Sequence, residues 1–418
     1  MSTFETNDYI DYTNNDSTIN IERNEDFIDH PAVTTCGDGT EENPYIIQSW
    51  RVKKIIIKNT NVFFEIKDCF LYDGYPIYFF RVTNGKIDNC LFEKDKGFKA
   101  IELKWSTNIL IKNCIINNYL HAFYLNYYSN NNLIDNCEIN DLGNQNEAFI
   151  LDSSNYNEIK NCNINEFDTY GFRLVESSNN NIHHCKIKNG GWYGFELYMS
   201  NQNQIKNCDV TECLEGIRLE RCNNNQIYYN NFYNNEETNV YTSLIGANIW
   251  DDGEIGNYWD DYSGKDNDND GIGDSSYNIA SDEKDNFPLK QSYETPFPPN
   301  VTGRPEGWFG KAYDYTFMAR DLDSNNIHLY IDWGDSNKEW YGPFKTDEEI
   351  KITHIYNKYG KYDIRAKARD MDGNKGNWGG VFRVTMPKSK LKRDFSILDF
   401  ILDLLNINRG FFENIFFM

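Results

Sequence analysis

Between residues 77 and 222 the chain repeats short segments in which apolar and polar side chains alternate. In "AFYLNYYS" and "GFELYMS" the alternation has the period of two that marks a half-buried β-strand. No stretch between these segments carries the wider apolar spacing of an amphipathic helix. Six segments of this kind predict strands: Ala100–Ser106, Ala122–Ser129, Ala148–Ser154, Gly171–Ser178, Gly194–Ser200 and Gly216–Cys222.

A second pattern, apolar–x–x–Cys–x–apolar, recurs between these strands. Its cysteines follow one another at intervals of 21 to 25 residues: Cys69, Cys90, Cys114, Cys137, Cys162, Cys185 and Cys208. A period of this length is typical of a solenoid, and the L-x-x-L-x-L pattern of leucine-rich repeats is absent. We therefore predict an all-β fold, a right-handed parallel β-helix of about nine coils, in which equivalent residues stack at about 4.8 Å.

Stacked coils predict a column of cysteines inside the solenoid. Cysteine is small and easily buried, and Asn230 replaces it in the last coil, which favours a structural role. Disulfides between adjacent coils are an alternative, although seven cysteines in a row cannot all pair. A metal is a third interpretation, but the chain has no CxxC motif.

The outward residues of the strands predict a candidate binding surface. One column holds Tyr78, Glu102, Tyr124, Ile150, Arg173, Glu196 and Arg218, and the next holds Phe80, Lys104, Asn126, Asp152, Val175, Tyr198 and Glu220. Aromatic rings stack on sugars and carboxylates accept hydrogen bonds from hydroxyls, so the columns predict glycan binding. The candidate binding residues are Tyr78, Tyr124, Asp152, Glu196, Tyr198 and Glu220.

Catalysis on the same surface is an alternative. Glycoside hydrolysis uses two carboxylates about 5–10 Å apart, which Glu196 and Glu220 on neighbouring coils can provide. The candidate catalytic residues are Glu196, Glu220, Asp152 and Glu102. A plain structural interpretation is also open, in which the outward charges are solvated and Glu196 pairs with Arg173 and Arg218.

The segment "GNYWDDYSGKDNDNDGIGDSSYNI" predicts a calcium site. Alternate aspartates and a glycine follow the pattern D-x-D-x-D-G-x-x-D, the first part of an EF-hand loop. The predicted Ca²⁺ ligands are Asp266, Asp268, Asp270, the carbonyl of Ile272, and Asp274. Tyr277 stands where an EF-hand has glutamate, so we expect Asp282, Glu283 or Asp285 to complete the shell. The ion is predicted to fasten the end of the solenoid.

Residues 37–289 resemble the NosD-type β-helix proteins, a family named for periplasmic copper binding. The resemblance rests on "GTEENPYII" at the start, the Asn-rich repeats, and "GNYW…DxDxDGxGD…DNFPL" at the end. It implies the β-helix fold, and it implies that Trp250, Tyr258, Trp259 and Phe287 close the last coil. The family name implies copper, but the six Met and six His include only one adjacent pair, His183–His184, which does not favour a copper site.

Proline-rich sequence from Phe287 to Gly307 predicts a linker to a second domain. The signature "YIDWGD…HIYNKYGKYDIRAKARDMDGNKG" that follows resembles the PKD family of immunoglobulin-like β-sandwiches. The resemblance implies that Trp333 and Tyr356 lie inside and that Asp332, Gly334 and Asp335 form a turn. Such modules act as spacers or adhesion units, and we predict no catalysis here.

The chain ends in a segment with apolar residues at helical spacing. We predict that this tail lies on a membrane surface, anchors the protein, or docks on the protein itself or a second copy. The predicted organisation is an N-terminal extension (1–36), a β-helix (37–250), a calcium-binding cap (251–290), a linker (291–306), a PKD-like sandwich (307–387) and the tail (388–418).

Composition narrows the function classes. A net charge of −23 and a pI near 4.7 disfavour nucleic acid as a partner. The N-terminus lacks the basic and apolar regions of a signal peptide, yet the resemblance to archaeal surface proteins implies an extracellular or cell-surface location. We therefore expect a structural or adhesive surface protein that binds a glycan, or alternatively a polysaccharide lyase or glycoside hydrolase.

Overall fold

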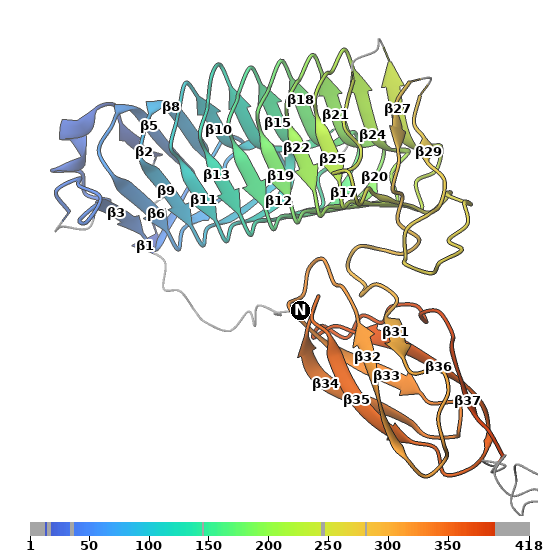
Figure 1. Cartoon of the computed structure of the whole chain (residues 1–418). Helices are drawn as coiled ribbons and strands as arrows, with labels where there is room; N and C mark the ends of the chain where they lie inside the picture. The colour runs from blue at the N-terminus through green and yellow to red at the C-terminus, as the bar shows by residue number, and fades with distance from the viewer. Residues whose placement is uncertain are drawn as a thin grey trace, which may run out of the picture. The chain divides into compact units, whose positions relative to one another are not determined.

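The computed structural model describes residues 13–14, 18–33, 37–143, 146–243, 247–280 and 282–388. The chain divides into two compact units. One unit, which ends at Tyr293 and leaves out Asp268–Asp270, is a parallel β-helix. The other takes those three residues and the chain from Glu294 onward, and it is a β-sandwich (Figure 1).

Each coil of the β-helix has three faces. The first face is a nine-stranded parallel sheet: β3 (Tyr45–Gln48), β6 (Phe64–Lys67), β9 (Gly85–Asp88), β11 (Leu110–Lys112), β13 (Leu133–Asp135), β16 (Glu158–Lys160), β19 (Asn181–His183), β22 (Gln204–Lys206) and β25 (Gln226–Tyr228). The other two faces form one larger sheet, because β10 (Leu91–Lys104) and β12 (Ile115–Asn126) run through the corner between them.

The second face also holds β4 (Trp50–Val52), β7 (Phe70–Leu71), β14 (Glu138–Asn140), β17 (Asn163–Phe167), β20 (Lys186–Gly190), β23 (Asp209–Thr211), β26 (Asn231–Tyr233) and β28 (Tyr258–Trp259). The third face also holds β2 (Thr18–Ile21), β5 (Lys54–Thr60), β8 (Ile77–Val82), β15 (Glu147–Asp152), β18 (Tyr170–Val175), β21 (Tyr193–Tyr198), β24 (Glu215–Glu220) and β27 (Thr238–Ser243). The β-helix and its parallel pairing confirm the predicted fold.

The solenoid begins earlier than the predicted boundary at residue 37. Strand β2 pairs in parallel with β5, and β1 (Thr13–Asn14) pairs with β4. A short 3₁₀ helix, η1 (Asn24–Phe27), follows β2. Ile19, Ile21 and Phe27 are buried, because they cover the open end of the apolar core.

The cysteine column lies at the corner between the first and second faces. All seven thiols are buried, and each sulfur lies 3.2–3.5 Å from the carbonyl oxygen two residues earlier. All nine cysteines in the described residues are free thiols, so the disulfide alternative is wrong for them, and Cys36 lies outside that part of the chain.

The corner also explains the asparagine before most of these cysteines. The preceding residue is left-handed in every coil, with φ between 50° and 54°: Asp68, Asn89, Asn113, Asn136, Asn161, His184 and Asn207. Asparagine tolerates this conformation better than most other residues. The asparagine content of the repeats therefore has a backbone cause.

A buried asparagine ladder lies at the corner between the third and first faces. In each coil the backbone N–H and the Nδ2 of one asparagine donate to the Oδ1 of the next, at 2.9–3.2 Å. The ladder consists of Asn132, Asn157, Asn180, Asn203, Asn225 and Asn248. It satisfies polar backbone groups that the turn leaves inside the solenoid.

Two carboxylates of the closing segment accept the last hydrogen bonds of two buried polar columns. One column is the asparagine ladder that ends at Asn248, and the other ends at Asn257. Glu283 accepts hydrogen bonds from Asn248 and from Trp250 Nε1, and Asp285 accepts from Asn257 and from Trp259 Nε1. Both residues belong to the segment that contains the antiparallel pair β29 (Tyr277–Asn278) and β30 (Lys284–Asp285). Their side-chain oxygens are used inside the solenoid, and neither residue belongs to the aspartate group of the predicted calcium loop.

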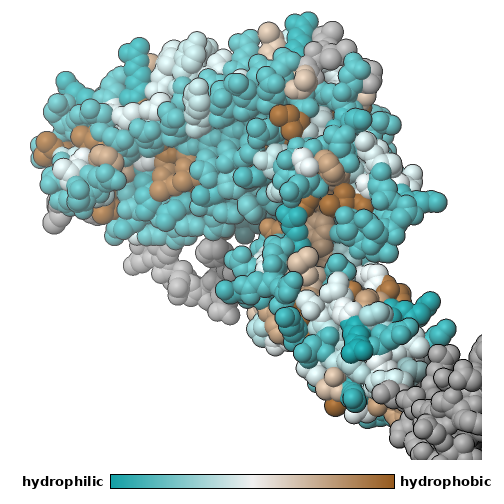
Figure 2. All heavy atoms as spheres, in the orientation of Figure 1, coloured by the Kyte–Doolittle hydropathy of each residue, from teal (hydrophilic) through white to brown (hydrophobic). Residues whose placement is uncertain are grey.

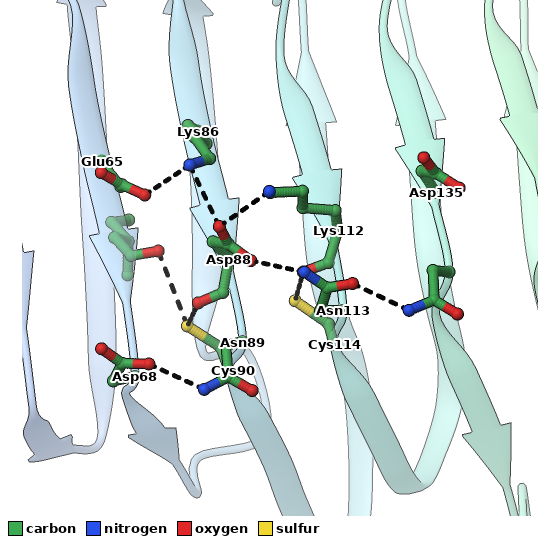
Figure 3. A network of polar contacts seen from close by, with 12 residues as sticks. Glu65, Asp68, Lys86, Asp88, Asn89, Cys90, Lys112, Asn113, Cys114 and Asp135 are labelled. Atoms are coloured by element: carbon green, nitrogen blue, oxygen red, sulfur yellow. Dashed lines mark hydrogen bonds and ion pairs between the residues drawn. The ribbon is translucent and has the colours of Figure 1, made fainter. Parts of the chain in front are cut away.

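The outward charges of the first face pair with one another along the helix axis. Figure 3 shows Lys86 between Glu65 and Asp88, with Nζ–O distances of 2.6 and 3.0 Å, and Lys112 at 3.2 Å from Asp88. Asn113 donates to the same aspartate at 2.9 Å. These pairs are partly exposed, so each contributes little stability, about 0–1 kcal/mol.

The second unit contains a three-stranded and a four-stranded antiparallel sheet. The first consists of β31 (Asn300–Gly303), β32 (Ala312–Met318) and β35 (Ile350–Ile355). The second consists of β34 (Lys338–Lys345), β33 (Asn326–Asp332), β36 (Gly360–Arg369) and β37 (Phe382–Met386).

The predicted interior and turn of this sandwich are present. Trp333 and Tyr356 are buried. Gly334 has a φ of 75° and donates its N–H to Asp332 Oδ1 at 3.0 Å, which forms the turn. The predicted tail, from residue 389 onward, lies outside the described residues. Within those residues, no helix has the length and apolar character that a membrane crossing requires.

Candidate functional site

The third face arranges its outward side chains in the two predicted columns. Strand register places Tyr78 beside Glu102, then Tyr124, Ile150, Arg173, Glu196 and Arg218 in successive coils. The neighbouring column runs Phe80, Lys104, Asn126, Asp152, Val175, Tyr198 and Glu220. All six predicted binding residues are partly exposed on this face.

Ion pairs occupy the carboxylates at one end of the third face. Arg173 donates to Glu196 at 2.9 Å and to Glu147 at 3.0 Å. Arg218 donates to Glu220 at 2.8 Å and to Glu215 at 3.2 Å. The strand register puts Arg218, not Glu220, directly beside Glu196.

Burial changes the pKa of Glu196 and Glu147 more strongly than Arg173 does. Desolvation raises the pKa of Glu196 above its usual value, and Arg173 offsets only part of the rise. The pKa of Glu147 rises for the same reason. Sequence analysis did not single out Glu147 or Glu215, because each lies at the first residue of its strand, outside the two alternating columns.

Cations and aromatic rings gather at the other end of the third face. Phe80, Trp105 and Tyr127 form an aromatic ladder with ring centroids 5.3 and 5.0 Å apart. Lys104 Nζ lies 5.0 Å from the Trp105 ring and 4.5 Å from the Tyr127 ring, and Arg81 lies 5.2 Å from the Phe80 ring. Trp105 is 37% exposed and Tyr127 is 48% exposed. Large rings at these exposures are available to a ligand.

Sequence analysis included Phe80 and Lys104 in a column but missed the other members of this ladder. Trp105 and Tyr127 follow the strands, at a corner where the backbone is left-handed, with φ of 50° for both. The same corner is left-handed at Ser153, Glu176 and Met199, so the conformation belongs to the fold and not to the aromatic side chains. The sequence does contain a sign of this ladder: in "LKWS" and "LNYYS" an aromatic residue directly follows the last outward residue of the strand.

A second pair of cationic and aromatic contacts extends this end of the face. Lys99 Nζ lies 3.9 Å from the Tyr124 ring centroid and 3.2 Å from Glu102 Oε1. Tyr75 and Phe98 stack at 5.4 Å and are about half exposed, at 41% and 53%.

Figure 2 shows that the visible side of the molecule is mostly hydrophilic, with apolar residues in small separate patches. A cavity of about 510 Å³ lies beside the second face and is lined by Phe70, Tyr72, Glu93, Lys94 and Asn118, none of which belongs to the predicted columns.

The predicted calcium loop brings three of its five candidate ligands together. One carboxylate oxygen from each of Asp266, Asp268 and Asp270 lies within 4.8 Å of the others. Gly271 has a φ of 93° and donates its N–H to Asp266, as a sharp turn requires. Asp274 accepts a hydrogen bond from the Asn267 N–H at 2.9 Å and lies outside the group. The calcium ion and the carbonyl of Ile272 remain predictions.

The fold and its faces define the protein as a parallel β-helix joined to a PKD-like β-sandwich. The sequence model of the family described as "Periplasmic copper-binding protein (NosD)" matches residues 6–181 and 52–264, which together exceed half of the chain. The chain belongs to this family. No curated protein sequence matches it.

Solved structures with similar folds cover each unit. A PKD domain of an M14-like peptidase from a Thermoplasmatales archaeon is 45% identical over 22% of this chain and 96% of its own length, with a TM-score of 0.22. An exopolygalacturonase from Thermotoga maritima is 12% identical over 58% of this chain and 78% of its own, with a TM-score of 0.35. The periplasmic alginate epimerase AlgG is 11% identical over 56% and 72%, with a TM-score of 0.35.

The described residues do not fit a copper site. His183 Nδ1 lies 2.9 Å from His184 Nδ1, and His183 Nε2 is bound to Glu158 at 3.0 Å. In the described part of the chain, three or more His, Cys, Asp or Glu ligand atoms come together only in two aspartate groups. Copper prefers nitrogen and sulfur ligands, whereas carboxylate oxygens suit hard cations.

Proposed function

We propose that the third face of the β-helix binds an extended glycan, outside the cytoplasm, as part of an adhesive or structural surface protein. The observation that carries the proposal is the aromatic ladder of Phe80, Trp105 and Tyr127 beside Lys104. Trp105 and Tyr127, with centroids 5.0 Å apart and planes tilted by 36°, offer exposed apolar surfaces to successive sugars, and Phe80 packs edge-on against Trp105. A lysine donates hydrogen bonds to hydroxyl or acidic groups.

The rest of the face supplies polar partners along the same direction. Asp152, Tyr198 and Glu220 follow Lys104 in one column, and Tyr78, Tyr124 and Glu196 lie in the other. A linear polymer laid along the helix axis meets one residue of each column per coil. The hydrophilic surface favours a sugar over a lipid or a large apolar protein interface.

The enzyme alternative rests on Glu196 and Glu220. Both carboxylates are already engaged, Glu196 by Arg173 at 2.9 Å and Glu220 by Arg218 at 2.8 Å, and the strand register places Arg218 rather than Glu220 beside Glu196. This arrangement favours a positioning or binding role over hydrolysis, in which two carboxylates flank one bond. We therefore propose binding as the function of this face.

The test is a panel of neutral and acidic polysaccharides offered to the full chain, with binding and newly released reducing ends measured together. We expect binding without release. Replacing Trp105 and Tyr127 by alanine removes two stacking contacts of about 1 kcal/mol each, so the dissociation constant rises about 30-fold.

The matched control is Tyr359→Ala. Tyr359 is 55% exposed and lies under Lys388 at 5.3 Å, so it has the same kind of contact, but it belongs to the β-sandwich. Unchanged binding after the Trp105 and Tyr127 substitutions, or no binding to any glycan, contradicts the proposal. Released ends that persist after Glu196→Gln and Glu220→Gln contradict the choice of these catalytic residues.

A further inference from the structure

A second group of acidic side chains lies in the β-sandwich, far in sequence from the predicted calcium loop. Asp321 and Asp323 belong to the loop between β32 and β33, and Asp370 follows the end of β36. One carboxylate oxygen of each lies within 4.8 Å of the other two. The fold therefore brings together carboxylates from two loops that the sequence separates.

Hydrogen bonds fix one member of this group. Asp370 is 2% exposed and accepts from the N–H groups of Gly373 and Asn374 at 2.6 and 2.8 Å and from Asn374 Nδ2 at 2.7 Å. These donors favour the ionised carboxylate and hold it in one orientation.

The second member has an unused oxygen. Asp321 is 7% exposed, and its Oδ1 accepts only a long contact of 3.5 Å from the Asp323 N–H. Its Oδ2 is buried and has no hydrogen-bond partner. A buried carboxylate oxygen without a partner is destabilising, and it is rare in a native fold unless a ligand satisfies it.

The charges of the group are also uncompensated. None of the ion pairs among the described residues involves Asp321, Asp323 or Asp370. Three adjacent carboxylates without a cation therefore oppose one another.

We propose that Asp321, Asp323 and Asp370 bind a hard divalent cation, with Ca²⁺ as the ion that fits best. Carboxylate oxygens are the preferred ligands of Ca²⁺, which accepts irregular sets of six to eight oxygens, whereas Mg²⁺ demands a near-ideal octahedron. Asp323 is exposed and gives the ion a way in, and water can fill the remaining positions. The ion ties the loop after β32 to the loop after β36.

The test measures Ca²⁺ stoichiometry on the full chain after removal of bound ions, by equilibrium dialysis, with Mg²⁺ in a parallel series. The double variant Asp321→Asn, Asp323→Asn keeps side-chain size and removes two charges. We expect it to lose one bound Ca²⁺ per chain. The triple variant Asp266→Asn, Asp268→Asn, Asp270→Asn in the other loop serves as the control and keeps that ion.

A second readout separates an ion site from a purely structural cluster. Without Ca²⁺, the Asp321→Asn, Asp323→Asn variant melts at or above the wild-type temperature, because repulsion between carboxylates is removed. With Ca²⁺, only the chains with an intact group gain stability, so the order reverses. Equal Ca²⁺ stoichiometry in the double variant and the wild type, or an order of melting that does not change with Ca²⁺, overturns the proposal.

Discussion

Replacement of Glu283 tests whether the polar columns hold the end of the β-helix. Glu283 is 8% exposed, and its Oε1 accepts from the Asn248 N–H and Nδ2 at 2.9 and 3.0 Å, while Oε2 accepts from Trp250 Nε1 at 2.9 Å. Alanine at this position leaves three N–H groups without a partner. Each costs about 1–3 kcal/mol when it stays buried.

The expected loss is smaller than the full sum. Trp250 is 1% exposed and cannot reach water, but Asn248 is only half-buried and regains part of its hydrogen bonding from solvent. We therefore expect Glu283→Ala to lower the free energy of unfolding of the last coils by about 2–4 kcal/mol. Glu283→Gln keeps an acceptor for Asn248 and turns an amide toward Trp250, so it loses about 1–3 kcal/mol.

The assay is guanidinium unfolding followed by far-UV circular dichroism, together with hydrogen exchange of the peptide that contains Trp250. Coils of a solenoid open separately, so exchange reports the local loss that a single global transition hides. Asp282→Ala is the control, because this neighbouring side chain is exposed. A Glu283→Ala protein within about 0.5 kcal/mol of the control, or a glutamine variant as unstable as the alanine variant, refutes the reasoning.

Two further predictions follow from burial in the solenoid. Burial, together with the charges of Lys99 and Arg173, lowers the pKa of His121 to about 4. Between pH 6.5 and pH 4 the unfolded chain therefore binds a proton that the folded chain does not. The free energy of unfolding decreases by up to about 3 kcal/mol as the pH decreases through this range. From pH 7 to pH 4.5, the denaturant midpoint should decrease less for His121→Gln than for the wild type. An equal decrease in both proteins contradicts the assignment of the pH dependence to His121. The cysteine column should not react with a thiol reagent until the chain unfolds. Rapid reaction of more than one thiol in the native protein, leaving Cys36 aside, contradicts the burial of the column.

Much of the β-helix follows from local patterns in the sequence. Side chains alternate with a period of two along a strand, and the coil repeats at a nearly constant interval, so Tyr78, Glu102 and Tyr124 had to share a column. Replacement of cysteine by Asn230 was also recognisable, because the same position recurs. These features depend on short stretches that repeat, and a repeat carries its register from one coil to the next.

Other features depend on which side chains of neighbouring coils contact one another, and this is set only in the folded solenoid. The pairing of Arg173 with both Glu147 and Glu196 joins three coils, and no spacing in the sequence distinguishes it from the predicted Glu196–Glu220 pair. Trp105 and Tyr127 lie next to each other because they occupy the same corner position of the third face in successive coils. Rotamer choice and exposure at a corner are properties of the folded coil.

The sequence by itself determined the strands, the coil period, the two outward columns, the buried thiols and the two structural units, because each rests on local alternation or on a repeat. Only the tertiary structure decided that Glu283 and Asp285 accept the last hydrogen bonds of the buried polar columns. It also decided that Asp321 and Asp370 meet in the sandwich. The physical reason is that a carboxylate takes its role from the donors, ions and solvent around it, and distant segments supply these only after folding.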